Sequence, residues 1–190
     1  MGLDNLKELD DFQEFKKFIK KFIIDSDDLF RLIYFPMSNP FSSECETMTP
    51  YDIFEASSEH GCVLFRRKND IVLSEESVNV LVNFHSAKVN DIFDDLFITF
   101  HVICKGVNIQ ELENGVNRCS AIANEIDNRF SKAVINDISK ISRLSYKDIS
   151  LNEENSGMLI TFNCRVFANH LLDNVNYLKK QYGVDNREYL

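Results

Sequence analysis

Two strand-like runs, one long amphipathic helix and two further strand-like runs follow one another between Val78 and Ala168. The first run, Ser77–Phe84, alternates apolar and polar residues, and the second, Leu96–Cys104, is rich in β-branched and aromatic residues. Period-two alternation is typical of a strand with one buried face, and the second composition is typical of a central strand. This ββαββ order predicts an α+β fold with a mixed or antiparallel sheet.

One long helix is predicted between the two pairs of strands. Its apolar residues recur every three or four positions: Ile109, Leu112, Val116, Cys119, Ile122, Ala123, Ile126 and Phe130. The polar side of the same helix carries Glu111, Asn114, Arg118, Asn124 and Asn128. Helical spacing of this kind places the apolar stripe against the sheet and leaves the polar side in solvent.

The two closing strands are predicted over Ile141–Ile149, a more polar run that suits a sheet edge, and over Met158–Phe167, which alternates strongly. The residues between them, Asn152–Gly157, tolerate turn geometry and predict a hairpin.

An N-terminal helical arm is predicted before the sheet, with helices over Leu6–Ile24 and Asp27–Tyr34. Pro36–Glu59 is interpreted as an extended loop, and short strands are predicted over Cys62–Arg67 and Ile71–Leu73. The chain is therefore interpreted as a single domain with four parts: an arm at 1–36, an irregular region at 37–76, the ββαββ core at 77–168 and a C-terminal extension at 169–190.

Composition limits the class of protein. With 190 residues and 44% apolar content, the chain can bury one substantial core. It has no membrane-length apolar run and no basic-then-apolar N-terminus, so we expect a soluble protein made in the cytoplasm, with no membrane partner. The five cysteines are scattered and odd in number, which predicts reduced thiols in the core rather than disulfides.

The formal charge of −9 argues against a general nucleic-acid binder, which normally presents a basic patch to the phosphates. The densest basic group, Lys16, Lys17, Lys20 and Lys21, lies on the polar side of the first predicted helix. We interpret it as a solvated helix face.

No motif predicts catalysis, a metal site or a cofactor, so we expect a protein that is not an enzyme. The four histidines are far apart, and no C-x-x-C pair or phosphate-binding loop occurs. His60 and Cys62 lack two further ligands at suitable spacing. An acidic cluster consists of Asp91, Asp94 and Asp95. One hypothesis is that this cluster binds a cation. A second is that it forms a hydrolase site together with His101.

Several segments resemble the tail-terminator, tail-completion and neck proteins of tailed bacteriophages, over roughly residues 25–168. The matching segments are Asp27–Tyr34, Phe97–Lys105, Arg118, Ile122–Asp127 and Leu159–Phe162. The chain departs from the pattern in two ways. It lacks an aromatic-rich loop after the second strand, and it has a C-terminal extension, Leu171–Leu190.

The resemblance implies a virion structural protein of the phage neck or tail. In such a protein, six or twelve copies form a ring that caps the tail tube or joins it to the portal, and DNA passes through the channel. An acidic lumen would repel the DNA backbone. The arms Leu6–Ile24 and Leu171–Leu190 would then reach adjacent subunits or rings.

Two segments are the candidates for interface or lumen contacts in such a ring, the loop Ser86–Asp95 and the hairpin at Asn152–Gly157. The candidate residues are Ser86, Lys88, Asp91, Asp94, Asp95, Asn152, Glu153, Glu154 and Asn155. The alternative to a ring protein is an intracellular α+β adaptor that forms a homo-oligomer and has no enzymatic activity.

Overall fold

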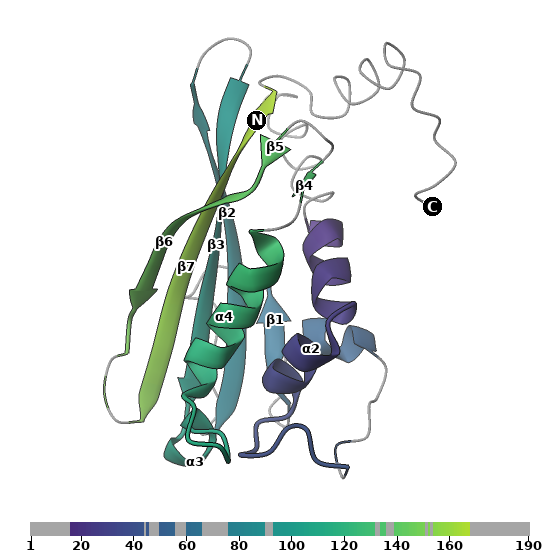
Figure 1. Cartoon of the computed structure of the whole chain (residues 1–190), viewed down its shortest axis with the longest axis vertical. Helices are drawn as coiled ribbons and strands as arrows, with labels where there is room; N and C mark the ends of the chain where they lie inside the picture. Colours follow the sequence, from purple (N-terminus) through teal and green to yellow (C-terminus); the bar gives the residue numbers. More distant parts are fainter. Residues whose placement is uncertain are drawn as a thin grey trace.

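The largest element of the structure is a five-stranded sheet with the strand order β1-β2-β3-β7-β6 and with helices on one face (Figure 1). The fold is α+β, as the sequence predicts. The structure is a computed structural model that describes residues 16–43, 45, 50–55, 60–65, 76–89, 93–131, 134–135, 139–150, 152 and 154–167.

The sheet is mixed, because β1 runs parallel to β2 while the other neighbouring strands are antiparallel. Its strands are β1 (Cys62–Leu64), β2 (Ser77–Lys88), β3 (Phe93–Lys105), β6 (Ser142–Asp148) and β7 (Asn155–Phe167). A separate pair of two-residue strands consists of β4 (Val134–Ile135) and β5 (Ser139–Lys140). β6 forms one edge of the sheet, as its polar sequence predicts.

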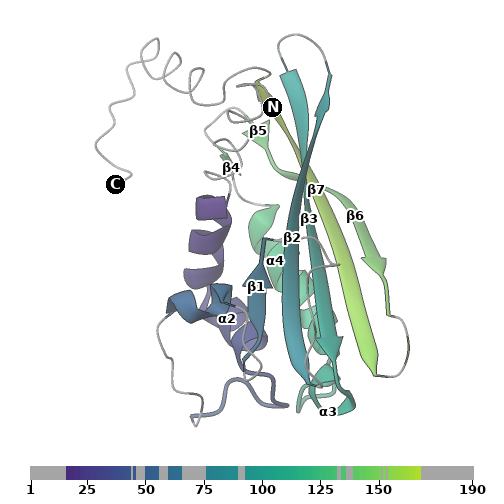
Figure 2. The same ribbon diagram turned by 180° about the vertical axis from the view of Figure 1, so that it is seen from behind.

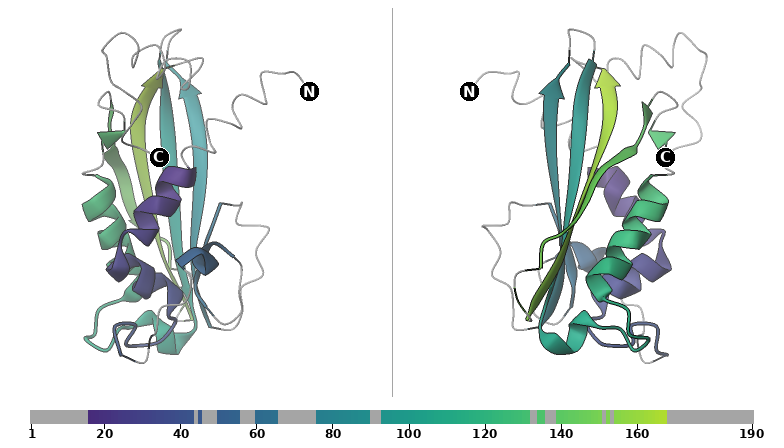
Figure 3. Two further views of the ribbon diagram at one scale, coloured as in Figure 1. Left: turned by 90° about the vertical axis from the view of Figure 1, so that its right-hand side faces the viewer. Right: turned by 60° about the vertical axis from the view of Figure 1, so that its left-hand side comes forward.

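Helices α2 (Asp27–Tyr34) and α4 (Arg118–Phe130) cover one face of the sheet, and Figure 2 shows β2, β3 and β7 in front of α4 when the molecule is seen from behind. Both views in Figure 3 place the two helices on the same side of the sheet. The Phe130 ring of α4 contacts Phe100 and Phe162 of the sheet, with ring centroids 5.3 and 4.8 Å apart. Edge-on aromatic packing of this kind stabilises the contact between the two layers.

The described part of the predicted N-terminal arm belongs to the same core. Residues 16–24 are helical, and Ile19 and Ile23 are fully buried against the sheet and α4 cluster. Ser26 caps α2 by accepting a hydrogen bond from the Leu29 amide at 3.2 Å. Leu6–Phe15, the predicted strand Ile71–Leu73 and the C-terminal extension lie outside the described residues, and the predicted division of the chain into four parts stays a prediction.

The prediction of one helix from Ile109 to Phe130 is wrong. A one-turn helix, α3 (Val107–Gln110), is separated from α4 by a loop in which Gly115 has a φ of 79°. Asn117 then caps α4, because its side chain accepts a hydrogen bond from the Ser120 amide at 3.0 Å. Val116, predicted as buried, is consequently exposed in the loop. Arg118, predicted on the solvated side, is fully buried.

Other boundaries differ from the predictions where polar residues extend a strand. β2 and β3 extend into the segment predicted as a loop, and β7 begins at Asn155 rather than Met158. β1 ends at Leu64, and the remainder of its predicted range after Phe65 lies outside the described residues. A short 3-10 helix, η1 (Pro50–Phe54), occurs within the predicted loop Pro36–Glu59.

Candidate functional site

The candidate residues Ser86, Lys88, Asp94 and Asp95 are strand residues of the β2–β3 hairpin, so the prediction that they form a loop is wrong. Lys88 is the register partner of Asp94 at the last paired position. Pairing continues through these polar residues because the ladder is made by backbone groups and needs no apolar side chain. We call this end of the sheet the hairpin end. Asp91 lies outside the described residues.

The candidate residues Asn152, Glu154 and Asn155 lie at the other end of the sheet, which we call the α3 end. The Asn152 Oδ1 atom accepts hydrogen bonds from the Glu154 amide at 3.1 Å and from Asn155 Nδ2 at 2.8 Å. β3, which pairs with Asn155 at Lys105, spans 13 residues between the two ends, or roughly 40 Å. The two candidate groups therefore form no common site. Glu153 lies outside the described residues.

The two described carboxylates at the hairpin end do not assemble a catalytic or metal site with His101. Asp94 and Asp95 project to opposite faces of the sheet, and Asp95 forms an ion pair with Arg165 at 3.1 Å. His101 lies six positions along β3 from Asp95, roughly 20 Å away. Among the described residues, no group of three His, Cys, Asp or Glu side chains could hold a metal ion.

One oxygen atom at the hairpin end lacks a hydrogen-bond donor. Asp94 Oδ1 is buried and has no hydrogen-bond partner within the described structure. A buried carboxylate oxygen without a donor costs free energy.

β6 is the most exposed regular element, because all seven of its residues are exposed. Among the described strands, it has a neighbour, β7, on one side only. Leu144 is an extra residue in a β-bulge between Arg143 and Ser145 and is 59% exposed. Arg143 and Tyr146 reach across to polar side chains of α4. A strand edge of this kind can pair with another chain.

A second strand edge occurs at the edge of the sheet opposite β6. β1 pairs with Asn79, Val80 and Leu81 of β2. The later part of β2, up to Lys88, is therefore next to β3 on one side and to no described strand on the other. Since β2–β3, β3–β7 and β7–β6 are successive antiparallel pairs, this part of β2 and β6 run in opposite directions.

The face of the sheet away from α2 and α4, here the far face, carries a row of hydroxyl and amide side chains. The registers align Asn83, Thr99, Thr161 and Ser145 across four strands. The neighbouring rows are His85, Phe97, Asn163 and Ser142 on one side and Leu81, His101, Leu159 and Lys147 on the other. These three rows contain no carboxylate, although the chain has a net charge of −9.

Arg118 joins three segments of the chain in the interior. Its Nε donates to Ile109 O at 2.7 Å, its Nη1 to Leu32 O at 2.8 Å and Phe35 O at 3.0 Å, and its Nη2 to Met37 O. Burial lowers the pKa of this guanidinium. Sequence reasoning missed its role because three of the four acceptors lie more than 80 positions away.

Two buried thiols lie beside Arg118. Burial raises the pKa of Cys104, whereas a hydrogen bond from Cys104 lowers the pKa of Cys119. The Cys119 Sγ atom is 3.4 Å from Ser156 O and also contacts the Ser156 hydroxyl at 3.5 Å. All five cysteines are free and buried, which confirms the prediction of reduced core thiols.

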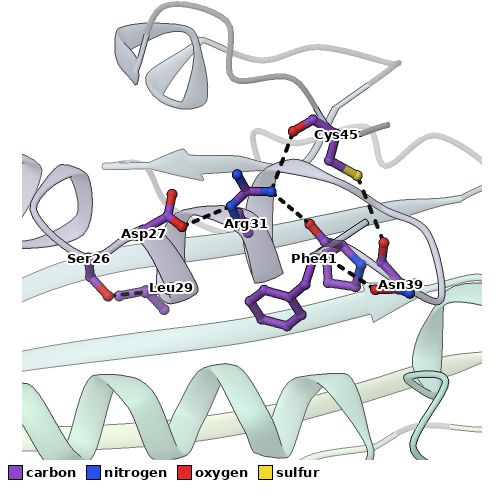
Figure 4. Close-up of polar contacts among 8 residues, drawn as sticks. Ser26, Asp27, Leu29, Arg31, Asn39, Phe41 and Cys45 are labelled. Atoms are coloured by element: carbon purple, nitrogen blue, oxygen red, sulfur yellow. Dashed lines mark hydrogen bonds and ion pairs between the residues drawn. The ribbon is translucent and has the colours of Figure 1, made fainter. Parts of the chain in front are cut away.

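The segment that follows α2 is held against this helix by Arg31 (Figure 4). The Arg31 side chain donates to Asp27 Oδ2 at 2.9 Å and to the carbonyl oxygens of Pro40 and Cys45 at 3.5 and 3.4 Å. These contacts fix the position of the loop that leads from α2 to the α3 end.

Comparison with known protein families shows what this chain is similar to. The family model described as YomW, a phage-derived name of the SPbeta type, matches residues 26–164, which is most of the chain. No curated protein and no solved structure matches the chain. None of the helices that the structure describes could span a lipid bilayer.

Proposed function

The chain belongs to the YomW family and is phage-related, and we propose that it is a structural protein of the virion whose copies form a ring in the neck or tail. DNA passes through the ring, which caps the tail tube or joins it to the portal. The protein performs no catalysis in this role. Its partners are further copies of itself, in six or twelve subunits, and the virion proteins above and below.

The observation that carries this proposal is the presence of two different strand edges on opposite sides of one sheet. β6 and the later part of β2 run in opposite directions. The β6 edge of one subunit can therefore extend the sheet of the next subunit as an antiparallel pair with β2. An interface between two unlike surfaces is heterologous. Repeated from copy to copy, it closes into a ring when the rotation between adjacent subunits divides a full turn evenly.

The registers indicate which residues meet at this junction. Ser145 of β6 and Asn83 of β2 belong to the same cross-strand row. If adjacent subunits are not shifted along the strand direction, Ser145 lies beside Asn83 of the next copy, and the hydroxyl and amide row continues from subunit to subunit. A closed sheet needs a shift between strands. A shift of two residues keeps the same face and would place Ser145 beside His85 instead.

Charge supports a role in which DNA passes without being held. Along the described strands, the far face carries three cations, Lys105, Lys147 and Arg165, and Arg165 is paired with Asp95. A surface with few cations releases few counterions from DNA and therefore binds it weakly. The net charge of −9 acts in the same direction.

Engineered cysteines test the proposed junction in the purified full-length chain. We expect Asn83→Cys/Ser145→Cys or His85→Cys/Ser145→Cys to give a ladder of disulfide-linked oligomers after mild oxidation, ending at six or twelve copies on non-reducing gels. The native cysteines are buried, so wild-type protein is the matched control. Each single variant carries half of the junction and should stay monomeric on the gel.

A disulfide-linked dimer from Ser145→Cys alone would contradict the ring. It would show that β6 pairs with β6 of a second copy in an isologous contact, which is the arrangement expected of the intracellular adaptor. Absence of linkage in both double variants would exclude the β6–β2 junction.

A further inference from the structure

Exposed apolar side chains gather at the α3 end of the molecule. Seven large apolar residues are exposed in the described part of the chain, from 37% for Tyr146 to 64% for Val107. Two of them lie on β6 and one, Val89, follows β2 at the hairpin end. The other four are Met37, Phe41, Val107 and Val116, which we call the α3-end surface.

Hydrogen bonds hold the segments of the α3-end surface together. Glu113 N donates to Ser38 O at 2.9 Å, and Asn39 Nδ2 donates to Glu113 Oε2 at 2.6 Å. The Phe41 amide donates to Asn39 Oδ1 at 3.3 Å. Arg118 binds the carbonyl oxygen of Met37 from the interior. The loop that carries Met37 and Phe41 is therefore fixed to the loop that carries Val116, and a fixed surface loses less conformational entropy when it binds.

Carboxylates frame the same end. Glu76, Glu111, Glu113 and Glu154 are all exposed there. Asn108 of α3 donates to Glu76 Oε1 at 2.9 Å, and Gly106 N donates to Glu154 O at 2.8 Å, so both residues lie beside α3. Lys105, the last residue of β3, also lies at this end of the sheet. Among the residues described here, the α3 end therefore combines exposed apolar groups with more carboxylates than cations.

This combination disfavours a second copy of the same end as the occupant. Two α3 ends placed face to face would bring eight such carboxylates together, four from each copy, and like charges across an interface cost several kcal/mol. Exposed apolar groups that lie among carboxylates at one end of a molecule form a candidate protein interaction site.

We propose that the α3-end surface docks a different protein, through an apolar contact surrounded by Lys and Arg side chains. Phe41 and Met37 supply the apolar anchors, and the glutamates pair with the cations of the partner. The inference rests on the proposed function in one respect: it places this partner at the axial rim of the ring, in contact with the neighbouring virion component.

Site-specific photo-crosslinking in infected cells tests the docking surface. The full-length chain is expressed during infection with p-benzoylphenylalanine in place of Phe41, and the linked peptides are identified by mass spectrometry. We expect a link to one other phage protein, at a peptide in which Lys or Arg adjoins apolar residues. The same photo-reactive residue in place of Asn128, which is exposed on α4, should give no such link.

Charge reversal provides the second measurement. We expect Glu111→Lys/Glu154→Lys to lower the yield of the Phe41 link by about tenfold or more, because reversed charges would face the cations of the partner. Asp28→Lys/Glu55→Lys is the control with the same change of charge elsewhere on the surface. An unchanged yield in Glu111→Lys/Glu154→Lys would overturn the proposed chemistry of the partner.

The docking surface and the virion role can fail independently. A Phe41 link only between copies of this chain, or no link, would overturn the docking surface even if purified particles contain the protein. Absence of the protein from purified particles would overturn the virion role, whereas the link in infected cells would still decide whether the α3 end binds a basic partner.

Discussion

The guanidinium of Arg118 satisfies four backbone carbonyls where the end of α2, the loop after it and α3 meet. Helical spacing places Arg118 on the polar side of the helix, in solvent. The residue is buried because the folded chain brings together the carbonyl oxygens that accept its hydrogen bonds, and local sequence does not contain this information. On the same helix, Cys119 and Ile122 are buried as the apolar spacing predicts, because their burial follows from the period of the pattern.

Replacing Arg118 should strongly destabilise the fold. We expect Arg118→Met to lower the free energy of unfolding by roughly 3–5 kcal/mol, because several buried carbonyls lose donors that contribute about 1–3 kcal/mol each. Urea unfolding monitored by circular dichroism measures the change. Arg129→Met removes a surface ion pair with Glu125 and should cost less than about 0.5 kcal/mol. Equal effects of the two substitutions would show that the carbonyl contacts contribute little.

Cys164 predicts a loss of stability at alkaline pH. Burial, and to a smaller extent the nearby Asp95, raise the pKa of this thiol from 9.0 to about 12. The folded state therefore retains a proton that the unfolded chain releases, so the stabilisation is complete below about pH 9 and is lost as the pH rises toward 12. Urea unfolding from pH 8 to pH 11 should show a steeper decline for wild type than for Cys164→Ala. Parallel declines would contradict the raised pKa.

The spacing of apolar residues predicts the presence of a helix or strand better than it predicts the residue at which that element ends. Asn114-Gly115 and the cap at Asn117 separate α3 from α4, and both signals are present in the sequence. The continuous apolar spacing from Ile109 to Phe130 outweighed them in the prediction. The extension of β2 from His85 to Lys88 contains one apolar residue, Ala87, and no apolar alternation. Backbone pairing with β3 determines it.

The parallel strand β1 packs tightly against the end of α2 at Gly61. A Cβ atom on Gly61 would lie 1.6 Å from the Ile33 carbonyl oxygen, so the two elements would have to move apart. We expect Gly61→Ala to lower the midpoint of thermal unfolding by several degrees, on the order of 2 kcal/mol or more. Gly115→Ala, at an exposed position with little crowding but a φ of 79°, should cost about 1 kcal/mol. A Gly61→Ala protein as stable as wild type would contradict this packing.

The exposed bulge of β6 allows edge pairing to be tested without disturbing the core. We expect Leu144→Lys to reduce self-association while leaving thermal stability within about 0.5 kcal/mol of wild type, because a charge on a strand edge opposes pairing and exposed positions tolerate substitution. Light scattering after size-exclusion chromatography measures the assembly. Val116→Lys, at the α3 end, is the matched control and should assemble normally. Loss of assembly in both variants would indicate a general effect of added charge.

For the whole molecule, the sequence predicts the α+β class and the hairpin of β6 and β7, because alternation, helical spacing and turn residues are local signals. It did not predict the separation of the candidate residues. Ser86 and Asn155 were grouped as possible contacts of one ring, and the register of β3 places them at opposite ends of the sheet. The path of β1 beside β2 and the burial of Ile19 and Ile23 against the sheet and α4 are equally non-local, so no window of sequence contains them.

The proposed ring can be observed by symmetry-resolved electron cryo-microscopy of the neck and tail of purified particles. We expect a sixfold or twelvefold ring between capsid and tail, with β6 of each subunit beside β2 of the next. Absence of this chain from the particles, or its presence as isolated copies or β6–β6 dimers, would contradict it.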